Sequence, residues 1–275
     1  MPELPEVEEV RRTLAPYLAG VAIAKVRVLR ADFVTPRNAP LGKLVGRTLS
    51  RTYRHGKKLF LTEGEDSQAG QTLLIHLGMS GRVDCVPADS PVAKHTHVII
   101  SLESETDVRL RDPRRFGGLW YYPTFAEALA KETSEMGKDA LLMTADDLAH
   151  WRSGSGRLKQ RLLSQRDVAG LGNIYVDEAL WMSKLHPLQL VSRISAEQIG
   201  ELVEAIHVVL NRSIESGGTT LRDYRNVTDQ PGEFARQLQA YGRGGEPCLR
   251  CGTRLSSRQV ATRTTVFCGV CQRRK

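Results

Sequence analysis

The first half of the chain has the hydrophobic pattern of short β-strands. Between Val21 and Pro123, runs of β-branched, aromatic and other apolar residues are separated by Gly, Pro, Asp and Ser. The runs are VAIAKVRVL, KLFLT, TLLIHLG, HVIISL, DVRLR and GGLWYY. Because no helical periodicity intervenes, they predict a β-sandwich or barrel and argue against a parallel sheet flanked by helices.

Helical periodicity marks the start of the chain and its second half. Apolar positions from Leu4 to Leu14 recur at helical spacing, and Gly20 can end that helix. The segment 157–187 reads as helix, turn and helix. A further helix is predicted over 195–217, where Ser195 and Gln198 form a capping box. The pattern therefore predicts a helical part that follows a β-rich part.

The composition is that of a globular protein with excess positive charge. The 275 residues are 41% hydrophobic and 25% charged, with a net charge of +8 and a pI of about 9.4. No apolar run approaches the roughly 18 residues that a membrane-spanning helix needs. The acidic first residues differ from a secretory signal, so we expect a cytoplasmic protein.

The positive charge is concentrated at the end of the chain. From Tyr241 to Lys275 there are eight Lys or Arg residues and one acid, Glu246. A local excess of this kind is typical of a surface that binds a polyanion, nucleic acid first. The alternative is a solvated basic tail.

Four of the five cysteines lie in the same basic segment, at Cys248, Cys251, Cys268 and Cys271. Two C-x2-C pairs separated by sixteen residues can place four thiolates around one tetrahedral Zn²⁺. The segment is too short for its own hydrophobic core, so the metal would supply folding energy. Four protein ligands leave no open position, which predicts a structural zinc. A pair of redox-active C-x2-C motifs is the alternative.

The first residues, MPELPEVEEVRR, combine a helix start with an unusual second residue. Pro5 and the glutamates suit the first turn of a helix. An ordinary helix start explains all of this except Pro2. Residue 2 is small enough for Met1 to be removed, which would expose a secondary amine beside Glu3. An α-amino group has a pKa of about 8, so roughly a tenth of it is neutral at pH 7.

The turn AGLGN before the second helix of 157–187 is a possible anion site. Asn173 occupies a predicted N-cap position, and Gly172 lets a ligand approach the backbone. A helix N-terminus with unpaired N–H groups attracts phosphate. An ordinary capped helix explains the same residues equally well.

An ordered set of motifs resembles the formamidopyrimidine-DNA glycosylase family of bacterial base-excision repair. The set is MPELPEVE, GMSG, DPRRFG, GLGNIYVDEAL, GGTTLRDY, YGRGGEPC and the four-cysteine finger. The resemblance implies an α+β multidomain fold. Residues 1–133 would form an N-terminal catalytic β-sandwich with an opening helix. Residues 134–240 would form a linker and a helix–two-turn–helix domain, and 241–275 a zinc-finger β-hairpin.

The resemblance also implies the catalytic residues. Pro2, after loss of Met1, would attack the anomeric carbon of the damaged nucleotide, and Glu3 would protonate the sugar ring oxygen. Lys57 matches a β-strand lysine that assists elimination; neighbouring Lys58 would point to the opposite face of the strand. Arg263 of the finger matches an arginine that takes part in δ-elimination and phosphate binding.

Further residues are implied to contact DNA. Three would fill the space left by the extruded base: Met79, Arg114 and Phe116. Three would bind phosphate: His95, with His97 as the competitor, Lys159 and Asn173. The loop 217–224, with Arg222, would close over the base, and Tyr241 would frame the pocket or bind phosphate.

The implied function is a bifunctional DNA glycosylase and AP lyase that acts on oxidised purines through β,δ-elimination. Its partner would be damaged duplex DNA, its cofactor one structural Zn²⁺, and its state a monomer in a bacterial cytoplasm. An endonuclease VIII-type enzyme for oxidised pyrimidines is the alternative, although its opening usually reads PEGPE. A non-catalytic DNA-binding protein would explain the basic tail but not the combination of Pro2, Glu3 and Lys57.

Overall fold

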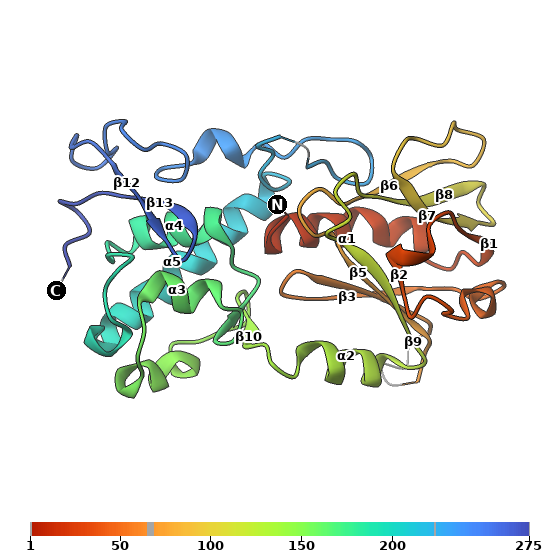
Figure 1. The fold of residues 1–275 in the computed structure, drawn as a ribbon, viewed down its shortest axis with the longest axis horizontal. Coiled ribbons are helices and arrows are strands. Elements are labelled where there is room, and N and C mark those ends of the chain that lie inside the picture. Colours follow the sequence, from red (N-terminus) through yellow and green to blue (C-terminus); the bar gives the residue numbers. More distant parts are fainter. Residues whose placement is uncertain (1, 65–68, 223, 275) are drawn as a thin grey trace. The chain divides into compact units, whose positions relative to one another are not determined.

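A computed structural model describes residues 2–64, 69–222 and 224–274 (Figure 1). The chain divides into two compact units. Unit 1 comprises residues 1–134 and 216–233, and unit 2 comprises 135–215 and 234–275. The first part of unit 1 ends at residue 134, one residue after the predicted boundary at 133. The predicted middle segment, 134–240, is divided between the units, and the cysteine-rich end belongs to the same unit as the helices.

Unit 1 contains two sheets, as the strand pattern predicts. One has the order β1-β7-β8-β6 and is antiparallel throughout, with β1 at Ile23–Val28, β7 at Thr96–Leu102, β8 at Thr106–Arg111 and β6 at Arg82–Pro87. The other has the order β2-β9-β5-β4-β3, with β2 at Val34–Thr35, β9 at Gly118–Tyr122, β5 at Thr72–His76, β4 at Lys58–Thr62 and β3 at Arg51–His55. In this sheet the short β2–β9 pairing is parallel, and the other pairings are antiparallel.

One hydrophobic core joins both sheets of unit 1 to its first helix, α1 (Leu4–Leu18) (Figure 1). Alternate residues of the strands, such as Leu59 and Leu61 in β4 and Val98 and Ile100 in β7, belong to this core. Burial of apolar side chains from two facing sheets is the main stabilising contribution in such a sandwich. The prediction of an N-terminal β-sandwich with an opening helix is therefore confirmed. Helix α2 (Phe125–Thr133) packs on β5 and β9, and Phe125 also contacts Phe60 of β4.

Unit 2 combines a helical domain with a β-hairpin. Its helices are α3 (Leu158–Leu163), α4 (Asn173–Met182) and α5 (Ala196–Glu215), with a short parallel pair formed by β10 (Lys138–Asp139) and β11 (Val168–Ala169). The hairpin consists of β12 (Ser256–Val260) and β13 (Arg263–Phe267). The predicted capping box at the start of α5 is present, since Ser195 and Gln198 exchange two hydrogen bonds of 3.2 Å.

Short 3-10 helices connect these elements: η1 (Ala31–Phe33) and η2 (Leu41–Leu44) in unit 1, and η3 (Asp146–Ser153), η4 (Val191–Arg193) and η5 (Phe234–Gln237) in unit 2. Within the three described ranges, no helix is both long enough and apolar enough to cross a membrane.

The α1 helix is fixed to the sheet by a buried acid. The Glu8 carboxylate accepts hydrogen bonds from Arg11 Nη2 at 2.7 Å, Arg12 Nε at 2.9 Å and Arg54 Nε, on β3, at 3.1 Å. Burial acts to raise the pKa of Glu8, but the hydrogen bond and charge of Arg11 and the charge of Arg54 outweigh it. The pKa falls from 4.5 to about 2.

This shift predicts a pH-dependent contribution of Glu8 to stability. A lowered carboxyl pKa stabilises the folded state above the unfolded pKa of 4.5, and the contribution is lost as the pH falls toward about 2. At pH 7 we expect Glu8→Gln to lower the free energy of unfolding by up to roughly 3 kcal/mol. Urea unfolding at pH 7, 5 and 3 measures the effect. The difference in unfolding free energy between wild type and Glu8→Gln should become smaller below pH 5. The exposed control Glu103→Gln should have nearly the unfolding free energy of wild type at each pH. A difference for Glu8→Gln that is independent of pH would refute this role.

Candidate functional site

The start of α1 holds Pro2 and Glu3 in a rigid, buried position. Both residues are buried, and Glu3 is the N-cap of the helix, in a capping box with Glu6. The Glu3 N–H donates to Glu6 Oε2 at 2.8 Å. A terminus that usually moves freely is here fixed at its second and third residues. Met1 lies outside the described residues.

Glu6 also fixes the segment 216–233, and the sequence analysis missed this role. Glu6 is 1% exposed, and its Oε1 accepts the Thr219 N–H at 2.7 Å. The Tyr224 hydroxyl donates to the Glu6 carbonyl at 3.3 Å. Gly218 has a φ of +87°, and a Cβ there would lie 3.2 Å from Glu6 Oε1. The only available signal was the capping-box spacing of Glu3 and Glu6.

Arg222, in the same segment, is exposed. It belongs to the predicted loop 217–224, and Asp223 of that loop lies outside the described residues. The contacts of Glu6 with Thr219 and Tyr224 fix the two flanks of Arg222 to α1.

Lys57 lies in the turn between β3 and β4, which corrects the prediction that it lies on a strand. The strand begins one residue later, at Lys58, whose Nζ is 2.6 Å from Glu132 Oε2 and 2.6 Å from the Glu132 carbonyl. The ion pair with Glu132 holds the Lys58 side chain at the end of α2. Lys57 lies in the turn before this strand, and Lys58 is the lysine that pairs with Glu132.

His76 is a second residue that the sequence analysis missed. It pairs with Lys58 in the β4–β5 register, one strand away from the turn that carries Lys57. Burial, together with the charges of Lys57 and Lys58, lowers the pKa of His76. The lowered pKa favours the neutral imidazole. Its place two residues before the GMSG motif was the available sequence signal.

Two loops carry the residues predicted to fill the space of an extruded base, and a buried acid joins them. Asp112 is fully buried. Its Oδ1 accepts from the Ser80 hydroxyl at 2.6 Å and the Arg114 N–H at 3.1 Å, and its Oδ2 accepts from the Gly117 N–H at 2.8 Å. A Cβ at Gly78 would clash with the backbone of Phe116 and Gly117. The GMSG and DPRRFG loops therefore form one rigid platform.

The platform presents large side chains to solvent. Met79 is 41% exposed and Phe116 56% exposed, although both are hydrophobic. The Arg114 guanidinium lies 4.8 Å from the centre of the Phe116 ring, in a cation–π contact. Exposed apolar side chains held by a rigid base are typical of a binding surface.

His95 and His97 have opposite environments. His95 is exposed, directly before β7, with a φ of +69°. His97 is 5% exposed, and its Nε2 is 2.8 Å from the Asp112 carbonyl oxygen. The Asp112 N–H in turn donates to the His95 carbonyl at 3.1 Å. Of the two, only His95 is accessible to solvent, and the same aspartate positions its backbone.

In unit 2, helix α4 begins one residue earlier than predicted. Gly172 is the N-cap and Asn173 is the first helical residue, which corrects the assignment of Asn173 as N-cap. The Asn173 Nδ2 donates to the Thr264 carbonyl of β13 at 2.8 Å. The side chain therefore connects the helix start to the hairpin, next to Arg263.

The predicted phosphate contact of Lys159 is wrong. Lys159 is fully buried, and its Nζ lies 2.6 Å from Asp177 Oδ1. A lysine with no exposed surface, paired with a buried carboxylate, does not reach a phosphate in solvent. The sequence could not show this because Asp177 lies on the facing helix.

Tyr241 lines a groove at the hairpin, close to the strand that Arg263 begins. Arg263 is exposed at the first position of β13, after a tight turn in which Ala261 and Thr262 both have positive φ. The backbone N–H of Tyr241 donates to Glu178 Oε1 at 2.8 Å. The groove has a volume of about 280 Å³ and is lined by Tyr241, Gly242, Gly244, Ser257, Thr264 and Val266.

The four finger cysteines form a metal site. Their Sγ atoms all lie within 4.8 Å of one another, which fits a tetrahedral Zn²⁺ with bonds of about 2.3 Å. The Trp181 Nε1–H donates to Cys248 Sγ at 3.4 Å, and the Cys271 N–H donates to Cys268 Sγ at 3.4 Å. Such donors stabilise thiolate ligands. The prediction of one structural zinc is confirmed.

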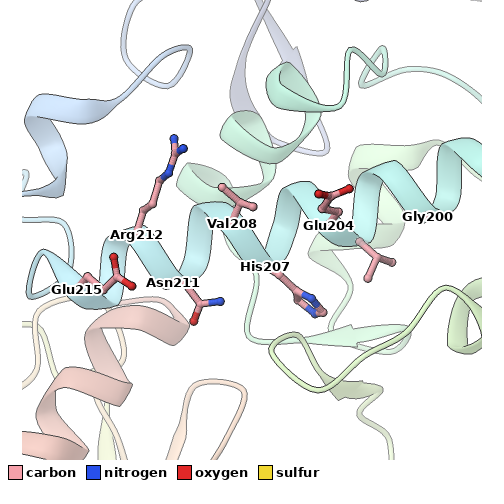
Figure 2. Close-up of a pocket in the computed structure, with 8 residues that line it drawn as sticks. Gly200, Glu204, His207, Val208, Asn211, Arg212 and Glu215 are labelled. Atoms are coloured by element: carbon pink, nitrogen blue, oxygen red, sulfur yellow. The ribbon is translucent and has the colours of Figure 1, made fainter.

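A second groove, of about 450 Å³, runs along α5 (Figure 2). Figure 2 shows His207 and Asn211 on one side of the helix and Val208 and Arg212 on the other. Among the described residues, His207 Nε2 has no hydrogen-bond partner. None of the predicted catalytic or DNA-contacting residues lines this groove.

Comparison with known proteins accounts for nearly the whole chain. Residues 1–119 match the formamidopyrimidine-DNA glycosylase N-terminal domain, residues 129–225 its H2TH domain, and residues 245–274 the zinc finger found in FPG and IleRS. A formamidopyrimidine-DNA glycosylase of Herpetosiphon aurantiacus is 40% identical over 278 residues, which cover 99% of this chain and 100% of the relative.

Solved structures agree with these matches. The wild-type Lactococcus lactis Fpg (MutM), in complex with an N7-benzyl-Fapy-dG containing DNA, has a TM-score of 0.90 and 32% identity. A MutM in complex with carbocyclic 8-oxo-G containing DNA has a TM-score of 0.89 and 31% identity. Each comparison covers 99% of this chain and 100% of the other. The chain therefore belongs to the formamidopyrimidine-DNA glycosylase family.

Proposed function

We propose that the protein excises oxidised purines, 8-oxoguanine and formamidopyrimidines, from duplex DNA and then cleaves the strand as an AP lyase. The observation that carries the proposal is the rigid start of α1, where Pro2 and Glu3 are adjacent and buried. Support for the substrate comes from relatives whose structures are solved in complex with DNA containing N7-benzyl-Fapy-dG or carbocyclic 8-oxo-G.

The chemistry begins once Met1 has been removed. The secondary amine of Pro2 attacks C1′ of the damaged nucleotide, the bond from C1′ to the base breaks, and the base leaves with that electron pair and takes up a proton. Glu3 donates a proton to the ring oxygen as the sugar ring opens. The product is an iminium ion, which acts as an electron sink without further protonation.

Strand cleavage follows from the iminium. Loss of a proton from C2′ expels the 3′ phosphate by β-elimination, and a second elimination expels the 5′ phosphate. Lys57 assists proton transfer from its turn in unit 1, and Arg263 of unit 2 stabilises the departing phosphate. The result is a gap of one nucleoside with phosphate at both ends.

A base must leave the duplex stack before this chemistry, and the platform of unit 1 suits that task. Met79 and Phe116 are the exposed apolar groups that enter the vacated space, and Arg114 supplies hydrogen-bond donors for the orphaned base. The rigidity that Asp112 confers matters because a loose wedge would gain less from insertion.

Phosphate binding is assigned to both units. In unit 1, His95 and Arg222 are exposed cationic or polar groups, and in unit 2 Asn173, Arg263 and Tyr241 lie at or beside the hairpin. The Asn173 amide nitrogen carries a second N–H besides the one given to Thr264, and this hydrogen suits a phosphate oxygen.

The nucleophile can be tested with Pro2→Gly. Borohydride reduces the iminium to a stable amine, so wild type incubated with 8-oxoguanine duplex should form a covalent adduct on a denaturing gel. We expect Pro2→Gly to abolish the adduct while weak DNA binding remains. The control Pro40→Gly changes an exposed proline in the same unit and should trap normally. A normal yield from Pro2→Gly would show that another amine is the nucleophile.

The substrate class can be tested by comparing two lesions in one duplex sequence. We expect single-turnover excision of 8-oxoguanine to be at least about tenfold faster than excision of thymine glycol. The reverse order would favour the endonuclease VIII-type alternative, and no excision of either lesion would reject a glycosylase.

Removal of zinc tests the role of the finger. Because Zn²⁺ supplies the folding energy of this segment, a chelator should unfold the hairpin and abolish DNA binding, and added Zn²⁺ should restore both. In the intact protein, affinity should fall steeply with salt as phosphate contacts release counterions. Unchanged affinity after verified metal loss would contradict this role.

A further inference from the structure

A buried ion pair occupies the junction of α3, α4 and β13 in unit 2. Lys159 and Asp177 are 0% and 1% exposed, and 2.6 Å separates Nζ from Oδ1. Burial raises the pKa of Asp177 to about 6, against the lowering effect of Lys159. A pair of this kind costs desolvation energy on both sides, so it is weak evidence for stability and a better candidate for fixing a specific geometry.

Both members of the pair also bind the backbone of β13. Asp177 Oδ2 accepts the Val266 N–H at 3.0 Å. Lys159 Nζ lies 3.5 Å from the Thr264 carbonyl, which also accepts the Asn173 amide at 2.8 Å. The pair thus fixes the strand at Thr264, the residue directly after Arg263, and again at Val266.

The next acid in α4 fixes the other side of the finger. The Glu178 carboxylate accepts the backbone N–H groups of Gln239, Ala240 and Tyr241 at distances between 2.8 and 2.9 Å. Glu178 therefore holds the chain that enters the finger, whereas Asp177 holds the hairpin strand. Asp177 therefore contacts the strand that carries Arg263.

We propose that the buried Lys159–Asp177 pair is a positioning device that holds β13 on α4, so that Arg263 and Asn173 bind phosphates in a single fixed register. The proposal rests on the proposed DNA-binding function. It replaces the predicted direct contact of Lys159 with an indirect role, since Lys159 acts through Thr264 on the neighbouring Arg263 and Asn173.

The variant Asp177→Asn tests this role directly. Its amide oxygen can still accept the Val266 N–H, but the buried Lys159 loses the negative charge of Asp177. We expect duplex affinity to fall by about tenfold or more, and the slope of log K against log salt to decrease in magnitude by about one to two phosphate contacts. On a preformed abasic site, the ratio of δ- to β-elimination product should fall.

Two controls separate positioning from general destabilisation. Asp167→Asn removes a different partly buried carboxylate of unit 2, one paired with Arg161 at 2.7 Å, and should leave the salt slope and product ratio unchanged. In an Arg263→Gln background, Asp177→Asn should reduce the slope much less than it does in wild type, because the contact that it positions is already gone. One zinc per chain in each variant verifies that the finger is folded.

The neutral pair Lys159→Met with Asp177→Asn covers the case in which the single variant fails to fold. A neutral pair leaves no uncompensated charge and should fold, yet we expect its salt slope and δ-to-β ratio to remain below those of wild type. A wild-type salt slope and δ-to-β ratio in either this double variant or folded Asp177→Asn would overturn the proposal. Additive effects of Asp177→Asn and Arg263→Gln on the salt slope would also overturn it. If wild type itself binds no lesion DNA, the proposed function fails first.

Discussion

The proposed chemistry depends most on the hydrogen bonds that the Glu6 carboxylate accepts. It is almost completely buried and accepts one N–H from Glu3 and one from Thr219, residues separated by more than two hundred positions in the chain. A nucleophile at a chain terminus would ordinarily lose its advantage to conformational freedom. By fixing residue 3 and the loop that contains Thr219 to one carboxylate, the fold gives residue 2 a defined place.

The same device recurs elsewhere in the molecule. Asp112 joins the two loops that present Met79 and Phe116, and in unit 2 Asp177 and Glu178 hold the two parts of the finger. In each case a buried acid accepts backbone N–H groups of a loop or strand whose exposed side chains are predicted to meet DNA. Hydrogen bonds from backbone N–H to a buried carboxylate are strong and directional, so each of these segments is held in place through its backbone.

Much of this organisation could be predicted from the sequence, because periodicity and cysteine spacing are local signals. The strands of the sandwich, the α5 capping box and the zinc site follow from residues close together in the chain. The errors arise where a partner far away in the sequence determines the position of a residue. Lys159 has the sequence context of a surface cation, but Asp177 holds it in the interior, and the loop 216–233 joins unit 1 through Glu6. The misplacement of Lys57 and Asn173 is smaller, since in each case the start of the observed element differs by one residue from the prediction.

The identity of the proposed attacking amine can be measured directly. Wild-type protein trapped on an 8-oxoguanine duplex and reduced with borohydride can be digested with protease and nuclease, and the modified peptide sequenced by mass spectrometry. We expect the sugar remnant to be attached to the nitrogen of Pro2, in a chain that lacks Met1. Attachment to Lys57 or any other amine, with Pro2 unmodified, would contradict it.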